Sequence, residues 1–259
     1  MPTRDHAPLG SPCWADLWTS DVEGSRRFYA GLFGWEATAP EPQFGGYFTF
    51  TRDGVPVAGA MGDMGDMRAD DTWKIYLTTA DAAATAEAAR AAGADVVAPP
   101  MAVADLGIQT VMQDPTGAPV GAWQAGTFPG FTVLDEHGAP GWFELHTRDH
   151  AGAVAFYQSV FGWETKAVGD SDQFRYSTMQ NPEAEGELAG IMDASFFLPD
   201  GAHPYWTVYW TVDDADAAVA SVNALGGSLV AGPEDTPYGR IATVADSTGA
   251  VLRLRVVPE

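Results

Sequence analysis

Cysteine, basic side chains and long apolar runs are all scarce in this sequence of 259 residues. Its single cysteine, Cys13, cannot form an internal disulfide, which is compatible with a reducing compartment. Because 13 Lys and Arg stand against 35 Asp and Glu, the formal net charge is −22, and such a field repels nucleic acid and anionic membranes. No apolar run is long enough to span a membrane, and residues 1–11 show no secretory signal. We therefore expect a soluble, cytoplasmic protein without nucleic-acid or membrane partners.

The chain does contain a repeat of about half its own length. The stretch FYAGLFGWE at residues 28–36 recurs as FYQSVFGWE at residues 156–164, an offset of 156 − 28 = 128. The turn sequence DPTGA at residues 114–118 returns as DSTGA at residues 246–250, an offset of 246 − 114 = 132. Small changes of offset place the insertions in loops. The repeat, together with a hydrophobic fraction of 46%, predicts two packed domains.

Each half shows the strand and helix pattern of two βαβββ modules. An alternating strand at residues 14–19 precedes Asp21, a helix N-cap, and a helix that carries Phe28 and Phe33 on one face and stops at Gly34. Further strands and an Ala-rich helix follow at residues 47–51, 55–61, 73–78, 82–92, 96–97, 110–112 and 119–123. The second half repeats the pattern at residues 142–147, 149 onward, 174–179, 187–192, 205–212 and 215–225, followed by strands up to Val257. The predicted class is α+β, with domains at residues 1–127 and 128–259.

Paired βαβββ modules resemble the vicinal oxygen chelate superfamily, which includes glyoxalase I, extradiol dioxygenases and bleomycin-resistance proteins. The resemblance rests on the helix starts at Asp21 and Asp149, the Phe-Tyr…Phe-Gly-Trp helix ends, and the Asp-x-Thr-Gly turns at Asp114 and Asp246. These motifs occur twice and cover nearly the whole chain. The tandem layout looks most like actinobacterial two-domain glyoxalase-like proteins. The resemblance implies that the two modules of each domain form a cupped mixed sheet.

The sequence departs from the metal-dependent members of this superfamily at the positions of their ligands. The resemblance implies His, Gln or Glu at four strand positions in each domain. Those positions carry Trp14, Ala58-Gly59, Lys74 and Gly121 in the first half, and Trp142, Ala189-Gly190, Thr207 and Arg253 in the second. None of these is a usable ligand for a divalent metal, and Lys74 and Arg253 would repel one. We therefore expect no metal and no other cofactor.

Strand alternation predicts which side chains face each cup, because the helix-facing set must be apolar. In the first domain these are Trp14, Asp16, Trp18, Lys74, Tyr76 and Thr78. In the second domain they are Trp142, Glu144, His146, Thr207, Tyr209, Thr211, Arg253 and Arg255. Aromatic rings with a few polar groups suit an organic ligand, so we take these sets, apart from Thr78, Thr211 and Arg255, as the candidate site.

Several candidates have two interpretations. Trp14 and Trp142 either contact a ligand or plug the cups. Glu144 and His146 lie two apart on one strand face, so they are either an acid and a base or a solvated or hydrogen-bonded pair. Arg253 either anchors a carboxylate or phenolate or neutralises Glu144. The loops with Met61, Met64 and Met67 and with Phe196 and Phe197 are either lids or ordinary loop anchors.

Three functions are compatible with this pattern. The first is a metal-independent protein of the bleomycin-resistance kind that binds an aromatic secondary metabolite or antibiotic in its cup. The second is a metal-free hydroxylase- or lyase/isomerase-type enzyme, with His146 and Glu144 as catalytic acid and base. The third is glyoxalase-type detoxification of 2-oxoaldehydes. We expect a monomer or a homodimer, with either one shared cup or one cup in each domain.

Overall fold

The computed structural model describes residues 4–171, 173–180 and 187–258, so residues 1–3 of the leader lie outside the described part. Its strands form two eight-stranded mixed sheets with the same order, one from each half of the chain. Across the first sheet the order is β2 (Glu36–Ala37), β3 (Phe48–Arg52), β4 (Val55–Met61), β1 (Pro12–Trp18), β5 (Thr72–Thr78), β8 (Pro119–Ala125), β7 (Gly107–Gln113) and β6 (Asp95–Val103). Across the second it is β10 (Glu164–Ser171), β11 (Phe174–Gln180), β12 (Glu187–Asp193), β9 (Pro140–Thr147), β13 (Tyr205–Thr211), β16 (Val251–Val256), β15 (Gly239–Ala245) and β14 (Ser228–Thr236). The α+β class and the duplicated domains are as predicted.

Four helices and one 3-10 turn complete the modules. They are α1 (Val22–Phe33), α2 (Ala82–Ala91), α3 (His150–Phe161), α4 (Ala215–Ala224) and η1 (Pro42–Phe44). The side chains of Asp21 and Asp149 cap α1 and α3, as predicted, by accepting hydrogen bonds from backbone N–H groups in the first turn. Gly34 and Gly162 end these helices at φ 71° and 70°, a left-handed conformation that favours glycine. None of the described helices is long and apolar enough to cross a membrane.

Three edge strands differ from the sequence prediction, and one of them is the two-residue β2, which was not predicted. β10 was not predicted, because its sequence ETKAVGDS lacks an apolar alternation and lies largely exposed on the sheet edge. β6 has nine residues, whereas the sequence predicts a strand only at residues 96–97. Its Pro99-Pro100 pair argues against a strand in a sheet interior, but an edge strand has one side without a partner and tolerates proline.

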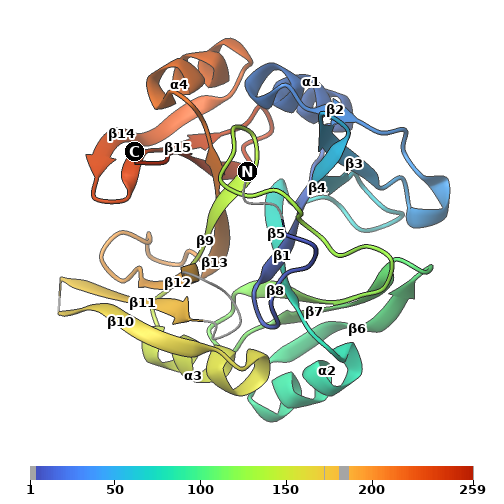
Figure 1. The fold of residues 1–259 in the computed structure, drawn as a ribbon, viewed down its shortest axis with the longest axis vertical. Coiled ribbons are helices and arrows are strands. Elements are labelled where there is room, and N and C mark those ends of the chain that lie inside the picture. Colours follow the sequence, from blue (N-terminus) through green and yellow to red (C-terminus); the bar gives the residue numbers. More distant parts are fainter. Residues whose placement is uncertain (1–3, 172, 181–186, 259) are drawn as a thin grey trace.

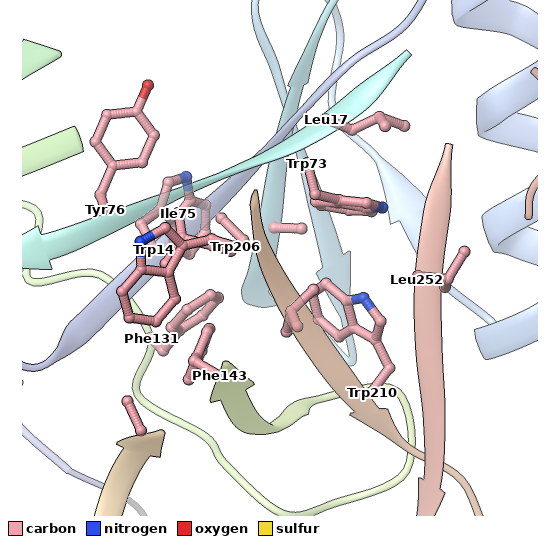
Figure 2. Close-up of a cluster of buried hydrophobic side chains, with 14 of the residues drawn as sticks. Trp14, Leu17, Trp73, Ile75, Tyr76, Phe131, Phe143, Trp206, Trp210 and Leu252 are labelled. Carbon is pink, nitrogen blue, oxygen red and sulfur yellow. The ribbon is translucent and has the colours of Figure 1, made fainter. Parts of the chain in front are cut away.

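The two sheets lie back to back, and their concave faces open in opposite directions (Figure 1). α1 contacts α4 at one end of the domain interface, and α2 contacts α3 at the other (Figure 1). Between the sheets, the ring of Trp73 on β5 packs against that of Trp210 on β13, with centroids 5.2 Å apart (Figure 2). Each domain therefore has its own concave face, which we call cup 1 in the first domain and cup 2 in the second.

The repeated Phe-Tyr…Phe-Gly-Trp motif lies in the core, as predicted, and it also joins the domains. The Tyr29 hydroxyl on α1 donates to Asp246 Oδ2 of the second domain at 2.8 Å, and the Tyr157 hydroxyl on α3 donates to Asp114 Oδ2 of the first at 2.9 Å. The other carboxylate oxygen of each Asp accepts the N–H groups of its own turn. Asp114 and Asp246 are thus turn formers, as predicted, that also receive a tyrosine from the other domain.

Candidate functional site

One buried carboxylate lies at the centre of each cup. Asp16 on β1 is paired in register with Gly59 of β4 on one side and Lys74 of β5 on the other. Glu144 on β9 occupies the equivalent position in the second sheet. The neighbours of Asp16 on the opposite face, Ala15 and Leu17, are apolar and fully buried, as the alternation of the strand requires.

In cup 2, three polar side chains converge on Glu144. Its Oε2 accepts a hydrogen bond from the Tyr176 hydroxyl at 2.8 Å, and its Oε1 accepts one from the Tyr209 hydroxyl at 2.8 Å. The same Oε1 lies 2.5 Å from Nε2 of His146. Trp142 Nε1 donates to the Tyr176 hydroxyl at 3.0 Å, so this indole is tied to the network. Because Glu144 is 5% exposed and His146 1%, they form a buried hydrogen-bonded pair and not a solvated one.

The charges in this network follow from its neighbours. Burial alone would raise the pKa of Glu144, but the hydrogen bond from His146 and the nearby Arg253 and Tyr209 outweigh it and lower that pKa, so the carboxylate is ionised. Burial lowers the pKa of His146, and Glu144 offsets this only in part, so the imidazole is neutral. A neutral imidazole has one N–H, and an ionised carboxylate can only accept hydrogen bonds. The N–H is therefore on Nε2, the nitrogen that faces Glu144. Nδ1 therefore accepts from the Tyr205 hydroxyl, 2.9 Å away.

Arg253 supplies the positive charge of cup 2. Its guanidinium carbon lies 5.1 Å from the centroid of the Tyr209 ring, an arrangement in which a cation contacts a π face. Burial lowers its pKa, whereas the neighbouring Tyr209, Glu144 and Tyr205 raise it by more. Arg253 therefore balances the charge of Glu144, and its half-buried side chain leaves it reachable from the cup.

Cup 1 has the same carboxylate and tyrosines but no charged partners. Tyr47 donates to Asp16 Oδ1 at 2.8 Å, and Trp14 Nε1 donates to the Tyr47 hydroxyl at 2.9 Å. The neighbouring Tyr76 also acts to lower the pKa of Asp16. Burial raises the pKa of Asp16 to about 6 despite these hydrogen bonds. Phe128 packs edge-on against Trp14, with ring centroids 4.7 Å apart, and Trp14 is only 5% exposed. Trp14 is therefore covered, whereas Trp142 in cup 2 is half-buried.

The remaining predicted residues have different surroundings. Lys74 pairs with Asp70, and its Nζ lies 5.8 Å from the centroid of the Trp18 ring, so it does not neutralise Asp16. The Nε1 atom of Trp18 in cup 1 and the Thr207 hydroxyl in cup 2 are buried and have no hydrogen-bond partner within the described part of the chain. Thr207 is paired in register with Glu144, so its free hydroxyl adjoins the network.

Sequence reasoning missed the tyrosines Tyr47, Tyr176 and Tyr205. Tyr47 and Tyr176 are repeated at an offset of 176 − 47 = 129, so the duplication contained a signal for them. Their position also explains two glycines, because a Cβ on Gly59 would lie 1.8 Å from the Tyr47 hydroxyl and one on Gly190 would lie 1.9 Å from the Tyr176 hydroxyl. The tyrosines therefore cross the strands where the resemblance places a metal ligand.

The residues of cup 2 do not fit the metal centre that the resemblance implies. Its four positions carry Trp142, Gly190, Thr207 and Arg253. The Gly190 position has no side chain and is crossed by the Tyr176 hydroxyl, and a guanidinium does not coordinate a divalent cation. Across the residues that the structure describes, no group of three His, Cys, Asp or Glu side chains is placed to hold a metal ion.

Two surface hollows lie away from both carboxylates. One, of about 360 Å³, is lined by residues of both domains, among them Leu9, Thr78 and Phe161, and contains no ionisable side chain. The other, of about 420 Å³, lies beside α3 and includes His150 and Arg175. Neither contains a member of the Asp16 or Glu144 networks, so the buried carboxylate networks lie away from both hollows.

Comparison with known proteins identifies relatives of both halves. Residues 139–254 match the Glyoxalase/Bleomycin resistance protein/Dioxygenase superfamily, and residues 14–121 match the Glyoxalase-like domain. The chain is 37% identical to the anthracycline biosynthesis protein DauV of Streptomyces sp. (strain C5), over 95% of this chain and 94% of that protein. It is 36% identical to the anthracycline biosynthesis protein DnrV of Streptomyces peucetius, again over 95% and 94%.

Solved structures share the fold at lower sequence identity. The Mn(II)-bound glyoxalase from Novosphingobium aromaticivorans superposes with a TM-score of 0.65 at 17% identity, covering 96% of this chain and 82% of that one. The 2,3-dioxygenase LapB from Pseudomonas sp. KL28 gives a TM-score of 0.64 at 15% identity, covering 98% and 94%. At such identities the similarity shows the arrangement of the modules alone.

Proposed function

Because the chain belongs to the glyoxalase/bleomycin resistance protein/dioxygenase superfamily, we propose that it binds an aromatic small molecule in cup 2 without the help of a metal. The observation that carries this proposal is the network around Glu144, in which an ionised carboxylate, a neutral imidazole and a guanidinium are held in place beside a half-buried tryptophan. A preformed set of rings and polar atoms gives a ligand both contact area and orientation.

Aromatic surface at cup 2 supports an aromatic ligand. Trp142 and Tyr205 are half-buried, and Phe197 is 51% exposed with its ring edge-on to His146 at a centroid distance of 5.1 Å. The loop that carries Phe197 is held by Arg148, which donates to the carbonyl oxygen of Leu198 at 2.8 Å. A ligand that covers two such rings buries roughly 300–500 Å², and at about 25 cal/mol per Å² this supplies several kcal/mol before ordering costs.

The relatives suggest the class of ligand. Two Streptomyces proteins that match over almost their whole length are named anthracycline biosynthesis proteins. An anthracycline skeleton is a fused-ring quinone with phenolic hydroxyl and carbonyl groups. Those groups match the polar atoms of cup 2, where the buried Thr207 hydroxyl has no partner within the described residues and Arg253 offers N–H donors. We therefore propose a fused-ring aromatic polyketide as the ligand.

The test is a titration of tryptophan fluorescence with anthraquinone and anthracycline compounds, checked by calorimetry. We expect saturable quenching in the micromolar range. Trp142→Ala and Arg253→Leu should each weaken binding at least tenfold, because one removes a ring and the other removes the positive charge beside Glu144 that complements a phenolate.

The matched control is Asp16→Asn, which alters the equivalent network in cup 1 and should leave the affinity unchanged. If no compound of the panel shows saturable binding, the proposal is wrong. Loss of binding on removal of divalent metal by a chelator would contradict its metal-independent part.

A further inference from the structure

Cup 2 contains a line of three hydrogen-bonded groups that has no counterpart in cup 1. The Tyr205 hydroxyl donates to Nδ1 of His146 at 2.9 Å, and Nε2 of the same ring lies 2.5 Å from Glu144 Oε1. The repeat places Thr72 at the position of Tyr205 and Trp18 at that of His146. Cup 1 therefore folds around its carboxylate without these groups, so the fold does not require them in cup 2.

Tyr205 is the most exposed member of this line, so it is the member that a ligand can reach. Glu144 and His146 are buried, whereas Tyr205 is half-buried at the start of β13. Since Tyr205 gives its own proton to His146, its oxygen presents lone pairs. Arg253 is the neighbouring cation, because Tyr205 is among the groups that raise its pKa. A hydroxyl group of a ligand placed at this oxygen would meet a proton acceptor on one side and a cation on the other.

We propose that Tyr205, His146 and Glu144 form a proton relay that ionises a phenolic hydroxyl of the ligand bound in cup 2. This inference rests on the proposed function. The O–H bond of the ligand breaks and its proton passes to the Tyr205 oxygen, while the proton of Tyr205 passes to His146 Nδ1. The resulting imidazolium keeps its Nε2–H on the Glu144 carboxylate, and Arg253 faces the phenolate. Protons and charges balance without an oxidant, a reductant or a metal.

Two physical features favour this transfer. Glu144 accepts hydrogen bonds from Tyr176 and Tyr209, which hold it ionised and aimed at His146. A buried carboxylate orients the imidazole and stabilises the positive charge that the ring acquires when it takes up a proton. Burial lowers the pKa of His146, so its protonation depends on pairing the new charges: the imidazolium faces the Glu144 carboxylate, and the phenolate faces the Arg253 guanidinium.

The experiment uses 2-hydroxyanthraquinone, whose visible absorption changes on ionisation, with the full chain. At a pH one unit below the pKa of the free probe, we expect most of the bound probe to show the phenolate spectrum. Tyr205→Phe keeps the ring and Arg253 but removes the relay, so the bound probe should return to the phenol spectrum while quenching of tryptophan fluorescence still reports binding. His146→Gln should do the same, and the double variant should add no further loss.

Tyr238→Phe, an exposed tyrosine in the turn between β14 and β15, is the control and should behave as wild type. A phenolate spectrum that persists in both Tyr205→Phe and His146→Gln would assign the ionisation to Arg253 alone and overturn the relay. A wild-type complex that stays in the phenol form would overturn it too, although the binding proposal would stand. Absence of binding by any fused-ring compound would instead remove the proposed function and this inference with it.

Discussion

Two carboxylates at equivalent positions of a duplicated fold have opposite protonation behaviour. Asp16 is buried among neutral donors, so burial dominates and its pKa rises to about 6. Glu144 is equally buried, but His146 and Arg253 reverse the outcome and its pKa falls. The side chains beside each carboxylate, and not the depth of burial, therefore decide which cup carries a permanent negative charge.

This difference predicts opposite pH dependences of stability. Because the folded-state pKa of Asp16 is above its usual 3.8, the folded state binds the extra proton, and this contribution to stability is present at low pH and lost as the pH rises through about 6. As the pH rises from 4.5 to 7.5, wild type loses this contribution and Asp16→Asn does not. The free energy of unfolding of the variant should therefore rise by about 2 kcal/mol relative to that of wild type. Urea unfolding at the two pH values measures it.

Glu144→Gln should show the reverse trend and serves as the control. The pKa of Glu144 is lowered in the folded state, so its contribution is present above the usual pKa of a glutamate and is lost as the pH falls. The variant should therefore lose stability relative to wild type as the pH rises from acid to neutral. A parallel response of the two variants would contradict the assignment of charge to cup 2.

At the scale of strands, β4 and β12 each contain a glycine that lets a tyrosine lie across them, Tyr47 from just before β3 and Tyr176 from β11. A Cβ at Gly59 or Gly190 would fall within 2 Å of the hydroxyl oxygen of Tyr47 or Tyr176, at 1.8 and 1.9 Å respectively. Each tyrosine thereby reaches the carboxylate at the centre of its cup. The same glycines stand at positions where the resemblance implies a metal ligand, and a tyrosine hydroxyl lies over each of them.

Gly190→Ala and Gly59→Ala form a matched pair that separates packing from function. Both must displace a tyrosine ring, so each should lower the free energy of unfolding by about 1–3 kcal/mol. Only Gly190→Ala breaks the hydrogen bond to Glu144, and it alone should weaken binding of the aromatic ligand, by at least tenfold. Thermal unfolding and fluorescence titration report the two effects. Equal affinities for the two variants would show that Tyr176 does not organise the ligand site.

At the scale of the whole molecule, each domain donates a tyrosine hydroxyl to a turn aspartate of the other. Tyr29 reaches Asp246 and Tyr157 reaches Asp114, so each turn aspartate is satisfied partly by its own backbone and partly by the other domain. The Trp73–Trp210 contact lies between the sheets (Figure 2). These contacts place the two cups on opposite sides of one core, so each domain supports the other's sheet while keeping its own concave face.

Tyr29→Phe and Tyr157→Phe test this exchange. Each removes the donor to a buried aspartate oxygen, which should cost about 1–3 kcal/mol in free energy of unfolding because the oxygen is left without a partner. The surface variant Tyr238→Phe should stay within about 0.5 kcal/mol of wild type. Chemical unfolding monitored by tryptophan fluorescence measures all three. Stabilities of the first two variants equal to wild type would show that the hydroxyls contribute nothing across the interface.

The sequence by itself determined the duplication, the α+β class, the helix caps at Asp21 and Asp149, and the burial of the Phe-Tyr…Phe-Gly-Trp motif. These follow from repeats and periodicities that are local in the chain. It also placed Glu144 and His146 on one strand face. It missed β10 and most of β6, because edge strands need neither apolar alternation nor the absence of proline.

Only the tertiary structure decided which side chains meet in each cup. Three tyrosines contact the Glu144–His146 pair from strands that are 30 or more residues away in the sequence, namely Tyr176, Tyr205 and Tyr209. No local sequence pattern predicts such contacts. The same holds for Phe128, which covers Trp14, and for the two tyrosines that cross between domains. The sequence already favours the second half, because Glu144, His146 and Arg253 stand where the first half has Asp16, Trp18 and Gly121. Charge and exposure depend on which side chains meet in space, so the protonation of each carboxylate and the exposure of each tryptophan follow only from the fold.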